Sequence, residues 1–293
     1  MLRSMFSAIS GIRAHQTMMD VVGNNIANVN TAGYKSARAT FQESLTQVSR
    51  GATQATAVNG GSNPFQIGLG TMVATIENSF TQGSTQMTGR ATDVAIQGDG
   101  FFAVESAGQL FYERAGSFNV DAAGNLVGVN GEFVLGGLAP VPGVGAATNS
   151  PDITNSGDPT QWEPTDYERV TIDLSTYSDP KISVDGTVTA RDNATGELHT
   201  VARIALATFA SPNGLVRGGN GLYTDSANAG LVGVGWPAEG PRGSLESGTL
   251  EMSNVDLATE FTNMIIAQRG FQANSRTVTA SDEILTELVN MKR

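Results

Sequence analysis

The chain has 293 residues, a formal net charge of −11 at pH 7 and no cysteine. The acidic balance, without any run of Lys or Arg, argues against nucleic-acid binding, and the lack of cysteine excludes disulfides and thiolate metal sites. Charged residues make up 15% of the chain and 35 residues are glycine, which is typical of a protein with many turns and short strands.

The N-terminal segment is expected to form a long amphipathic helix over residues 1–30. Apolar residues recur there at spacings of three and four, the period of one helix face. The apolar positions of this stripe are Leu2, Met5, Ile9, Ile12, Met19 and Ile26. His15, on the same segment, has no partner at metal or catalytic spacing, so we interpret it as a polar helix position.

The segment "VVGNNIANVNTAGYKS" is expected to end this helix and redirect the chain. Asparagine favours helix ends because its side chain hydrogen-bonds to nearby backbone. We therefore predict side-chain hydrogen bonds from Asn24, Asn25 and Asn28. Gly33 permits a positive φ, and a side chain there is expected to impair assembly more than it destabilises the β domain. Tyr34 can anchor the turn on a neighbour, and the following lysine can reach a carboxylate.

The middle of the chain changes character. Residues 33–70, rich in Ser, Thr, Gln and Gly, are expected to form a linker arm. Residues 71–251 hold short apolar runs separated by Gly, Asn and Asp, which predict an all-β domain, a barrel or sandwich. Residues 139–169 are rich in proline and are interpreted as an extended loop or a reduced insertion.

A second long helix is predicted over residues 255–290. Its stripe advances by alternating steps of three and four, as in a coiled-coil seam. The stripe consists of Phe261, Met264, Gln268, Phe271, Ser275, Val278, Asp282, Leu285 and Val289. The fold class is therefore mixed α and β, with an inserted β domain and with residues 1–32 and 252–293 paired as a coiled-coil-like terminal module. Polar members of the two stripes, including Gln16, favour self-association, because burying them in a monomer core would cost several kcal/mol.

The sequence offers little chemistry. His15 and His199 are the only histidines, and Gly98-Asp99-Gly100 is better explained as a turn than as a phosphate-binding loop. We expect no catalytic, cofactor-binding or metal-binding residue, and no enzyme activity. No apolar run approaches the ~18 residues needed to span a bilayer, and the N-terminal segment lacks the apolar region of a secretory signal. We therefore expect no membrane insertion and an export route that uses another signal.

Four blocks of the sequence resemble bacterial flagellar rod and hook proteins. "NNIANVNTAGYK" is similar to their N-terminal motif, and a long stretch beginning "IGLGTMVATIENSF" resembles the entry to their β domain. "YERAGSFNVDAAGNLVGVNGEFVLG" resembles the hairpins that follow, and "SNVDLATEFTNMIIAQRGFQANSRTV" resembles the C-terminal helix. The resemblance covers about half of the chain.

This resemblance implies a non-enzymatic subunit of the extracellular flagellum that polymerises with itself into a hollow helical tube. It implies helices in the inner layers, the β domain outside, and an arm between layers. Rod, hook-cap and hook–filament junction proteins are the implied neighbours, with the flagellar type III apparatus as exporter.

Within the family, the resemblance is interpreted as that of a hook protein, a bendable tube that transmits torque from motor to filament, with the distal rod protein as the alternative. The C-terminal block looks more like hook, and the glycine-rich arm, with Gly51, Gly60, Gly61, Gly68 and Gly70, favours a bendable polymer. The short length, which leaves little space for an outer domain, keeps the rod as the alternative. A secreted adhesin, folded as a monomer, is a more distant alternative.

Overall fold

A computed structural model describes residues 2–54, 60–138 and 168–291. The chain divides into two compact units. The first, called the helical unit here, comprises Met1–Val29, Ser36–Ser79 and Val255–Arg293. The second, called the β unit, comprises Asn30–Lys35 and Phe80–Asn254. The backbone therefore passes from one unit to the other four times.

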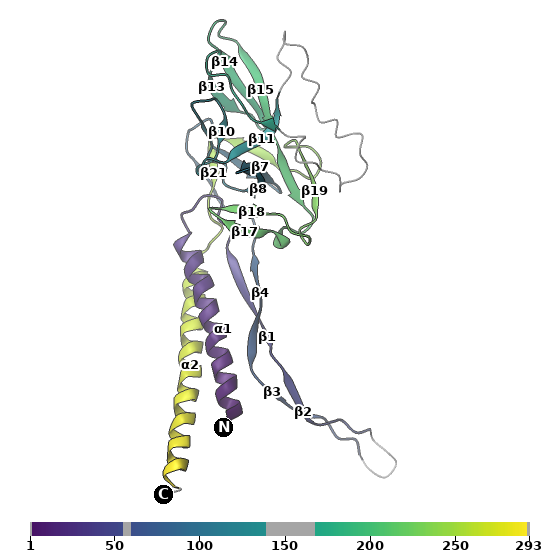
Figure 1. The fold of residues 1–293 in the computed structure, drawn as a ribbon, viewed down its shortest axis with the longest axis vertical. Helices are drawn as coiled ribbons and strands as arrows, with labels where there is room; N and C mark the ends of the chain where they lie inside the picture. Colours follow the sequence, from purple (N-terminus) through teal and green to yellow (C-terminus); the bar gives the residue numbers. More distant parts are fainter. Residues whose placement is uncertain (1, 55–59, 139–167, 292–293) are drawn as a thin grey trace. The chain divides into compact units, whose positions relative to one another are not determined.

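Two long helices dominate the helical unit, as expected for the two ends of the chain. They are α1 (Leu2–Ala27) and α2 (Leu257–Asn290), and they lie side by side (Figure 1). They run antiparallel, since Gly11 lies opposite Asn274 and His15 lies opposite Gly270. Asp256 caps the start of α2, where its carboxylate accepts the Ala258 N–H at 2.9 Å. In the described part of the chain, neither helix is apolar over the length that a bilayer crossing requires.

The remainder of the helical unit is a pair of β ribbons. β1 (Ala37–Glu43) pairs antiparallel with β4 (Thr71–Asn78), and β2 (Thr46–Arg50) pairs antiparallel with β3 (Phe65–Gly68). The segment expected to be a linker arm therefore contains three strands, and the partner of the first of them starts at Thr71. The arm and β4 belong to the same unit.

The β unit contains the remaining strands. Their bounds are β5 Thr85–Met87, β6 Val94–Gln97, β7 Phe101–Ser106, β8 Gln109–Glu113, β9 Asn119–Val120, β10 Leu126–Val127, β11 Phe133–Leu138, β12 Glu168–Arg169, β13 Tyr177–Ile182, β14 Thr187–Asp192, β15 Leu198–Ile204, β16 Leu206–Phe209, β17 Val216–Gly219, β18 Leu222–Thr224, β19 Leu231–Gly235, β20 Ser244–Ser247 and β21 Thr249–Glu251. A 3-10 turn, η2, spans Pro212–Gly214. Apart from β12, the proline-rich segment 139–169 lies outside the described residues.

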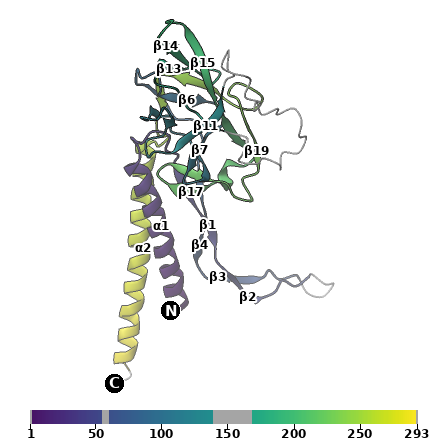
Figure 2. The same ribbon diagram turned by 45° about the horizontal axis from the view of Figure 1, so that its top comes forward.

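Thirteen of these strands form one sheet, whose main path is β13-β14-β15-β11-β7-β8-β18-β17. β13, β14 and β15 lie next to one another in antiparallel register (Figure 2). β6 pairs with β20 and β5 with β21, so the last strands of the β unit close onto its first. The expected all-β middle domain is confirmed as a large β-rich unit.

The turns occur where glycine was expected to place them. Gly98, Gly100, Gly124, Gly131 and Gly186 all have positive φ, between 80° and 142°, a region that favours glycine. The short Gly-Asp-Gly segment is thus a strand connection. Between these turns, alternate side chains point into two buried clusters, one around Phe102 and Phe118 and one around Phe101 and Phe209.

Candidate assembly site

α1 and α2 contact each other at two glycines, Gly11 and Gly270. Ala8, Gly11 and Ala14 are buried on α1, and Ala267 and Ser281 are buried on α2. A methyl group on Gly11 would lie 2.6 Å from Nδ2 of Asn274, so a larger residue there would have to displace the Asn274 side chain. The Asn274 amide thus packs against Gly11, and the His15 ring packs against Gly270.

The predicted stripe of α2 is only partly buried in the single chain. Met264, Phe271, Val278 and Leu285 are half-buried, as a helix-contact series with heptad spacing requires. The other predicted series, at Gln268 and Asp282, is exposed, while Ser275 is half-buried. The buried residues of α2 are Ala267 and Ser281, one residue before Gln268 and Asp282, and the half-buried Asn274 lies between them in the same series.

The other predicted residues of the stripes lie outside the closest contact. Met5, Ile9, Ile12, Met19 and Ile26 are half-buried, whereas Gln16, Phe261 and Val289 are exposed. Leu2 belongs to α1, but its side chain is not among those described. These apolar positions stay predicted contacts of the assembled form.

The asparagines at the end of α1 make the expected hydrogen bonds. Asn25 is fully buried: its Oδ1 accepts the Ala37 N–H at 2.9 Å, and its Nδ2 donates to the Ala37 carbonyl at 2.8 Å and to Oε1 of Glu260 at 3.1 Å. One side chain therefore joins α1, the start of β1 and the first turn of α2. Asn28 Nδ2 donates to the carbonyl of Asn24 at 2.9 Å, which closes the last turn of α1.

Gly33 has a φ of 68°, as expected, and its N–H donates to the Glu251 carbonyl at 2.8 Å. A methyl group on Gly33 would lie 2.5 Å from the backbone nitrogen of Ala115. Gly33 is thus packed inside the β unit, and a side chain there should destabilise that unit directly. This reverses the expectation that such a substitution would act mainly on assembly.

Tyr34 and Lys35, which follow Gly33, are also held in place by contacts with the β unit. Arg217 lies over the ring of Tyr34, with its guanidinium carbon 4.9 Å from the ring centroid, and its Nη2 donates to the Lys35 carbonyl at 2.7 Å. Tyr34 therefore packs on a neighbouring residue, as its place in the motif suggested.

Lys35 reaches a carboxylate, and that carboxylate belongs to Glu251. Lys35 Nζ lies 2.6 Å from Oε1 of Glu251, and Arg114 Nε lies 2.7 Å from Oε2. All three side chains are at most 5% exposed. The Gly83 N–H also donates to Oε1, at 2.8 Å. One buried carboxylate therefore binds two cations and a backbone amide.

Burial lowers the pKa of Lys35, and the hydrogen bond to Glu251 opposes that effect only in part. Burial alone would raise the pKa of Glu251, but Arg114 and Lys35 outweigh it and hold the pKa below its ordinary value. The Glu251 carboxylate is therefore ionised at neutral pH, and it acts as a structural clamp between segments that are distant in the sequence. Elsewhere in the described ranges, no three His, Asp or Glu side chains are grouped as a metal site.

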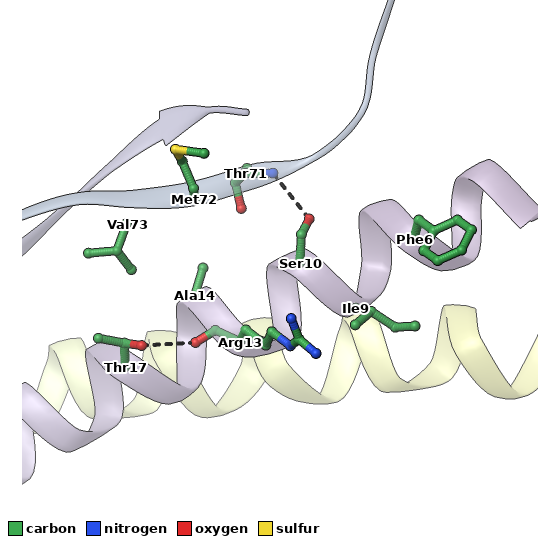
Figure 3. Close-up of a pocket in the computed structure, with 9 residues that line it drawn as sticks. All are labelled: Phe6, Ile9, Ser10, Arg13, Ala14, Thr17, Thr71, Met72 and Val73. Atoms are coloured by element: carbon green, nitrogen blue, oxygen red, sulfur yellow. Dashed lines mark hydrogen bonds between the residues drawn. The ribbon is translucent and has the colours of Figure 1, made fainter. Parts of the chain in front are cut away.

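A groove runs between α1 and the start of β4 (Figure 3). Its volume is about 500 Å³, and its lining residues are Phe6, Ile9, Ser10, Arg13, Ala14, Thr17, Thr71, Met72 and Val73. The Thr71 N–H donates to Ser10 Oγ at 3.2 Å, which holds β4 beside α1. Phe6 and Met72 line the groove and are exposed, so its apolar surface is open to a partner.

Three family models match the chain. "Flagella basal body rod protein" matches residues 5–35, "Flagellar hook protein FlgE/F/G D1 domain" matches 95–190, and "Flagellar basal body rod FlgEFG protein C-terminal" matches 246–291. The first match contains most of α1 and the asparagine segment, and the last contains α2. The matched ends are therefore the segments that meet in the helical unit.

Individual relatives fall into two groups. The chain is 43% identical to the flagellar basal-body rod protein FlgG of Bacillus subtilis over 294 aligned positions, which cover 100% of both chains. It is 35% identical to FlgG of Agrobacterium fabrum, over 97% of both chains. The chain is 29% identical to the flagellar hook protein FlgE of Borreliella burgdorferi, again over 100% of both chains, but this alignment spans 442 positions.

Proposed function

Because this chain belongs to the family of bacterial flagellar rod and hook proteins, we propose that it is a structural subunit of the distal rod of the flagellar basal body. The observation that carries the proposal is the match in length and identity to rod proteins along the whole chain. Members of the family are parts of the flagellar basal body and hook, external to the cell.

The comparisons do not favour the hook subunit that the sequence blocks suggested. Relatives named hook proteins are 28–29% identical over 442 and 467 positions, although this chain has only 293 residues. The hook relatives therefore carry a large additional segment that this chain lacks. A rod subunit accounts for both the length and the higher identity.

In the proposed assembly, the helical unit is the polymerising module. We propose that α1 and α2 pair in a coiled-coil-like manner through Ala8, Gly11, Ala267 and Asn274, and that they form the inner layers of a tube. The β unit forms an outer layer. A head-to-tail interface that does not close generates such an open helical polymer.

The paired strands of the arm are evidence for a stiff polymer and against a bendable one. Its glycines favoured flexibility when only the sequence was considered, but β1 and β2 are each paired with another strand. Paired strands resist rearrangement more than an open linker, because each displacement breaks several backbone hydrogen bonds. A rigid drive shaft needs this property.

The partners of the proposed subunit are other copies of the chain, the rod and hook proteins at either end of its segment, and the flagellar type III export apparatus. Terminal helices with exposed apolar side chains, such as Phe261 and Ile265, fit a subunit that orders on assembly. No cofactor is needed for this role.

Genetic complementation tests the proposal. The chain is expressed as the sole rod protein in a flagellated bacterium that lacks its own FlgG, and in parallel in a strain that lacks its own hook protein. We expect restored motility in the first strain and none in the second, together with straight polymers in electron micrographs. Restoration of the hook-deficient strain alone, or curved polymers, would refute the rod assignment.

A further inference from the structure

The C-terminal end of α2 extends past α1. Because Gly11 lies opposite Asn274 and the helices run antiparallel with the same rise per residue, Leu2 lies level with about Glu283. From Ile284 onward, α2 therefore has no α1 beside it, as Figure 1 also shows. This last part of α2 is called the overhang here.

The overhang has an apolar face beside an acidic one. Ile284 and Leu288 are four residues apart, so they lie on one face, and they are 47% and 48% exposed. Glu283 and Glu287 are also four residues apart and are exposed on the adjoining face. Among the described residues, neither glutamate has an ion pair. An apolar helix end with unpaired carboxylates is suited to a surface that is apolar and carries a cation.

The groove between α1 and β4 is such a surface. Phe6, Ile9 and Met72 supply apolar walls, and Arg13 supplies the cation. Within the described part of the chain, Arg13 has no ion pair. The volume of about 500 Å³ lies within the range of protein binding pockets, roughly 300–1,000 Å³.

The overhang cannot fill the groove of its own chain. α2 is one continuous helix of 34 residues, and its last turns lie beyond the start of α1, whereas the groove extends along α1 from Phe6 to Thr17. The occupant must therefore come from another molecule, and the overhang is a complementary segment that every copy presents.

We propose that the overhang of one copy docks in the α1–β4 groove of the next, with Ile284 and Leu288 against its apolar walls and Glu283 or Glu287 paired with Arg13. Groove and overhang are different surfaces of the same chain, so the contact is heterologous and propagates. This inference rests on the proposed function, because it requires a polymer.

Site-directed cross-linking tests the proximity. The chain has no cysteine, so the double variant Phe6→Cys and Leu288→Cys introduces the only two thiols. Treatment of the assembled variant with a short bifunctional thiol reagent should produce a ladder of covalent multimers. The matched control pairs Leu288→Cys with Val129→Cys, an equally accessible position in the β unit, and should give no ladder.

Charge reversal tests the pairing. Arg13→Glu and Glu287→Arg should each raise the protein concentration needed for assembly about tenfold or more, because like charges then meet at the contact. The two reversals combined should restore assembly. Lys181→Glu, an exposed reversal in the β unit, should have no effect on assembly. Circular dichroism of each unassembled variant should match that of the unassembled wild type.

The outcomes separate the two proposals. Failure of the unaltered chain to polymerise would overturn the subunit function and the docking with it. The docking alone would be overturned if normal polymers gave no ladder of cross-linked multimers from the Phe6→Cys and Leu288→Cys variant. It would also be overturned if the single charge reversals had no effect on assembly, or if combining them did not restore assembly. Cross-links that form only to an unrelated protein would also overturn it.

Discussion

Glu251→Gln is expected to be among the most damaging conservative substitutions in the chain. The change keeps the shape of the side chain but removes the single negative charge that faces Lys35 and Arg114. Both cations would remain buried, at 1% and 5% exposure, without a counter-charge. Breaking a buried ion pair in this way costs about 3–5 kcal/mol, a large part of the 5–15 kcal/mol that typically stabilises a domain.

The geometry also predicts a ranking. Lys35→Met removes one cation but leaves Glu251 bound to Arg114 at 2.7 Å and to the Gly83 N–H at 2.8 Å. The loss is then chiefly that of the hydrogen bonds of Lys35 to Glu251 and the Thr81 carbonyl, roughly 1–3 kcal/mol. Part of that loss is offset, because Lys35→Met also removes the cost of burying the Lys35 charge, the same cost that lowers the pKa of Lys35.

The assay is urea unfolding of the full chain at pH 7, followed by the fluorescence of Trp236 in a Trp162→Phe background. Glu197→Gln, an exposed change in the β unit, serves as the control and should shift stability by less than about 0.5 kcal/mol. A loss below about 1 kcal/mol for Glu251→Gln, or a smaller loss than for Lys35→Met, would refute the clamp. Because the pKa of Glu251 is lowered, its contribution is present above the ordinary glutamate value and is lost as the pH falls through the folded-state pKa.

Three further predictions concern other positions. Gly33→Ala should destabilise the β unit by about 3 kcal/mol or more, because of positive-φ strain and contact with Ala115. Gly131 has open space around it, so Gly131→Ala should lower the free energy of unfolding by only about 1 kcal/mol in the same urea titration. Burial raises the pKa of Glu113 to about 8, so the stability of the wild type should fall as the pH rises from about 4.5 to 8. In thermal melts Glu113→Gln should be as stable as the wild type at pH 5 and more stable by roughly 2–4 kcal/mol at pH 9. Equal stabilities at pH 9 would contradict this. Gly270→Leu should separate the terminal helices and abolish polymers in electron micrographs while leaving the β-unit melting transition unchanged; wild-type polymers would show that the close contact is dispensable.

Local patterns made the helices and the turns of the β unit predictable. The period of three and four residues placed α2 within two residues of its observed start, and single glycines between apolar runs marked positive-φ turns such as Gly124 and Gly186. Asn25 and Asn28 were also identifiable, because asparagine at a helix end has a specific backbone chemistry.

Long-range contacts were beyond the same reasoning. The partner of Lys35 lies 216 residues away, and nothing in the spacing of either segment indicates Glu251. In α2 the spacing pointed to Met264, Phe271 and Leu285, which are half-buried, but the buried Ala267 and Ser281 were missed because hydrophobicity was weighted over size. Gly11 and Gly270 were the available signal for the helix contact. The arm was read as a linker because its strands are exposed and lack the alternation that a buried face imposes.

The division of the chain into two interleaved units has a mechanical consequence. The peptide backbone passes between the helical unit and the β unit four times, so a tensile load applied to one unit reaches the other through four covalent connections in parallel. Each connection then carries only a share of the force, and a single proteolytic cut leaves the units still tethered. For the proposed rod subunit, this arrangement supplies a redundancy that a domain attached by one linker would lack.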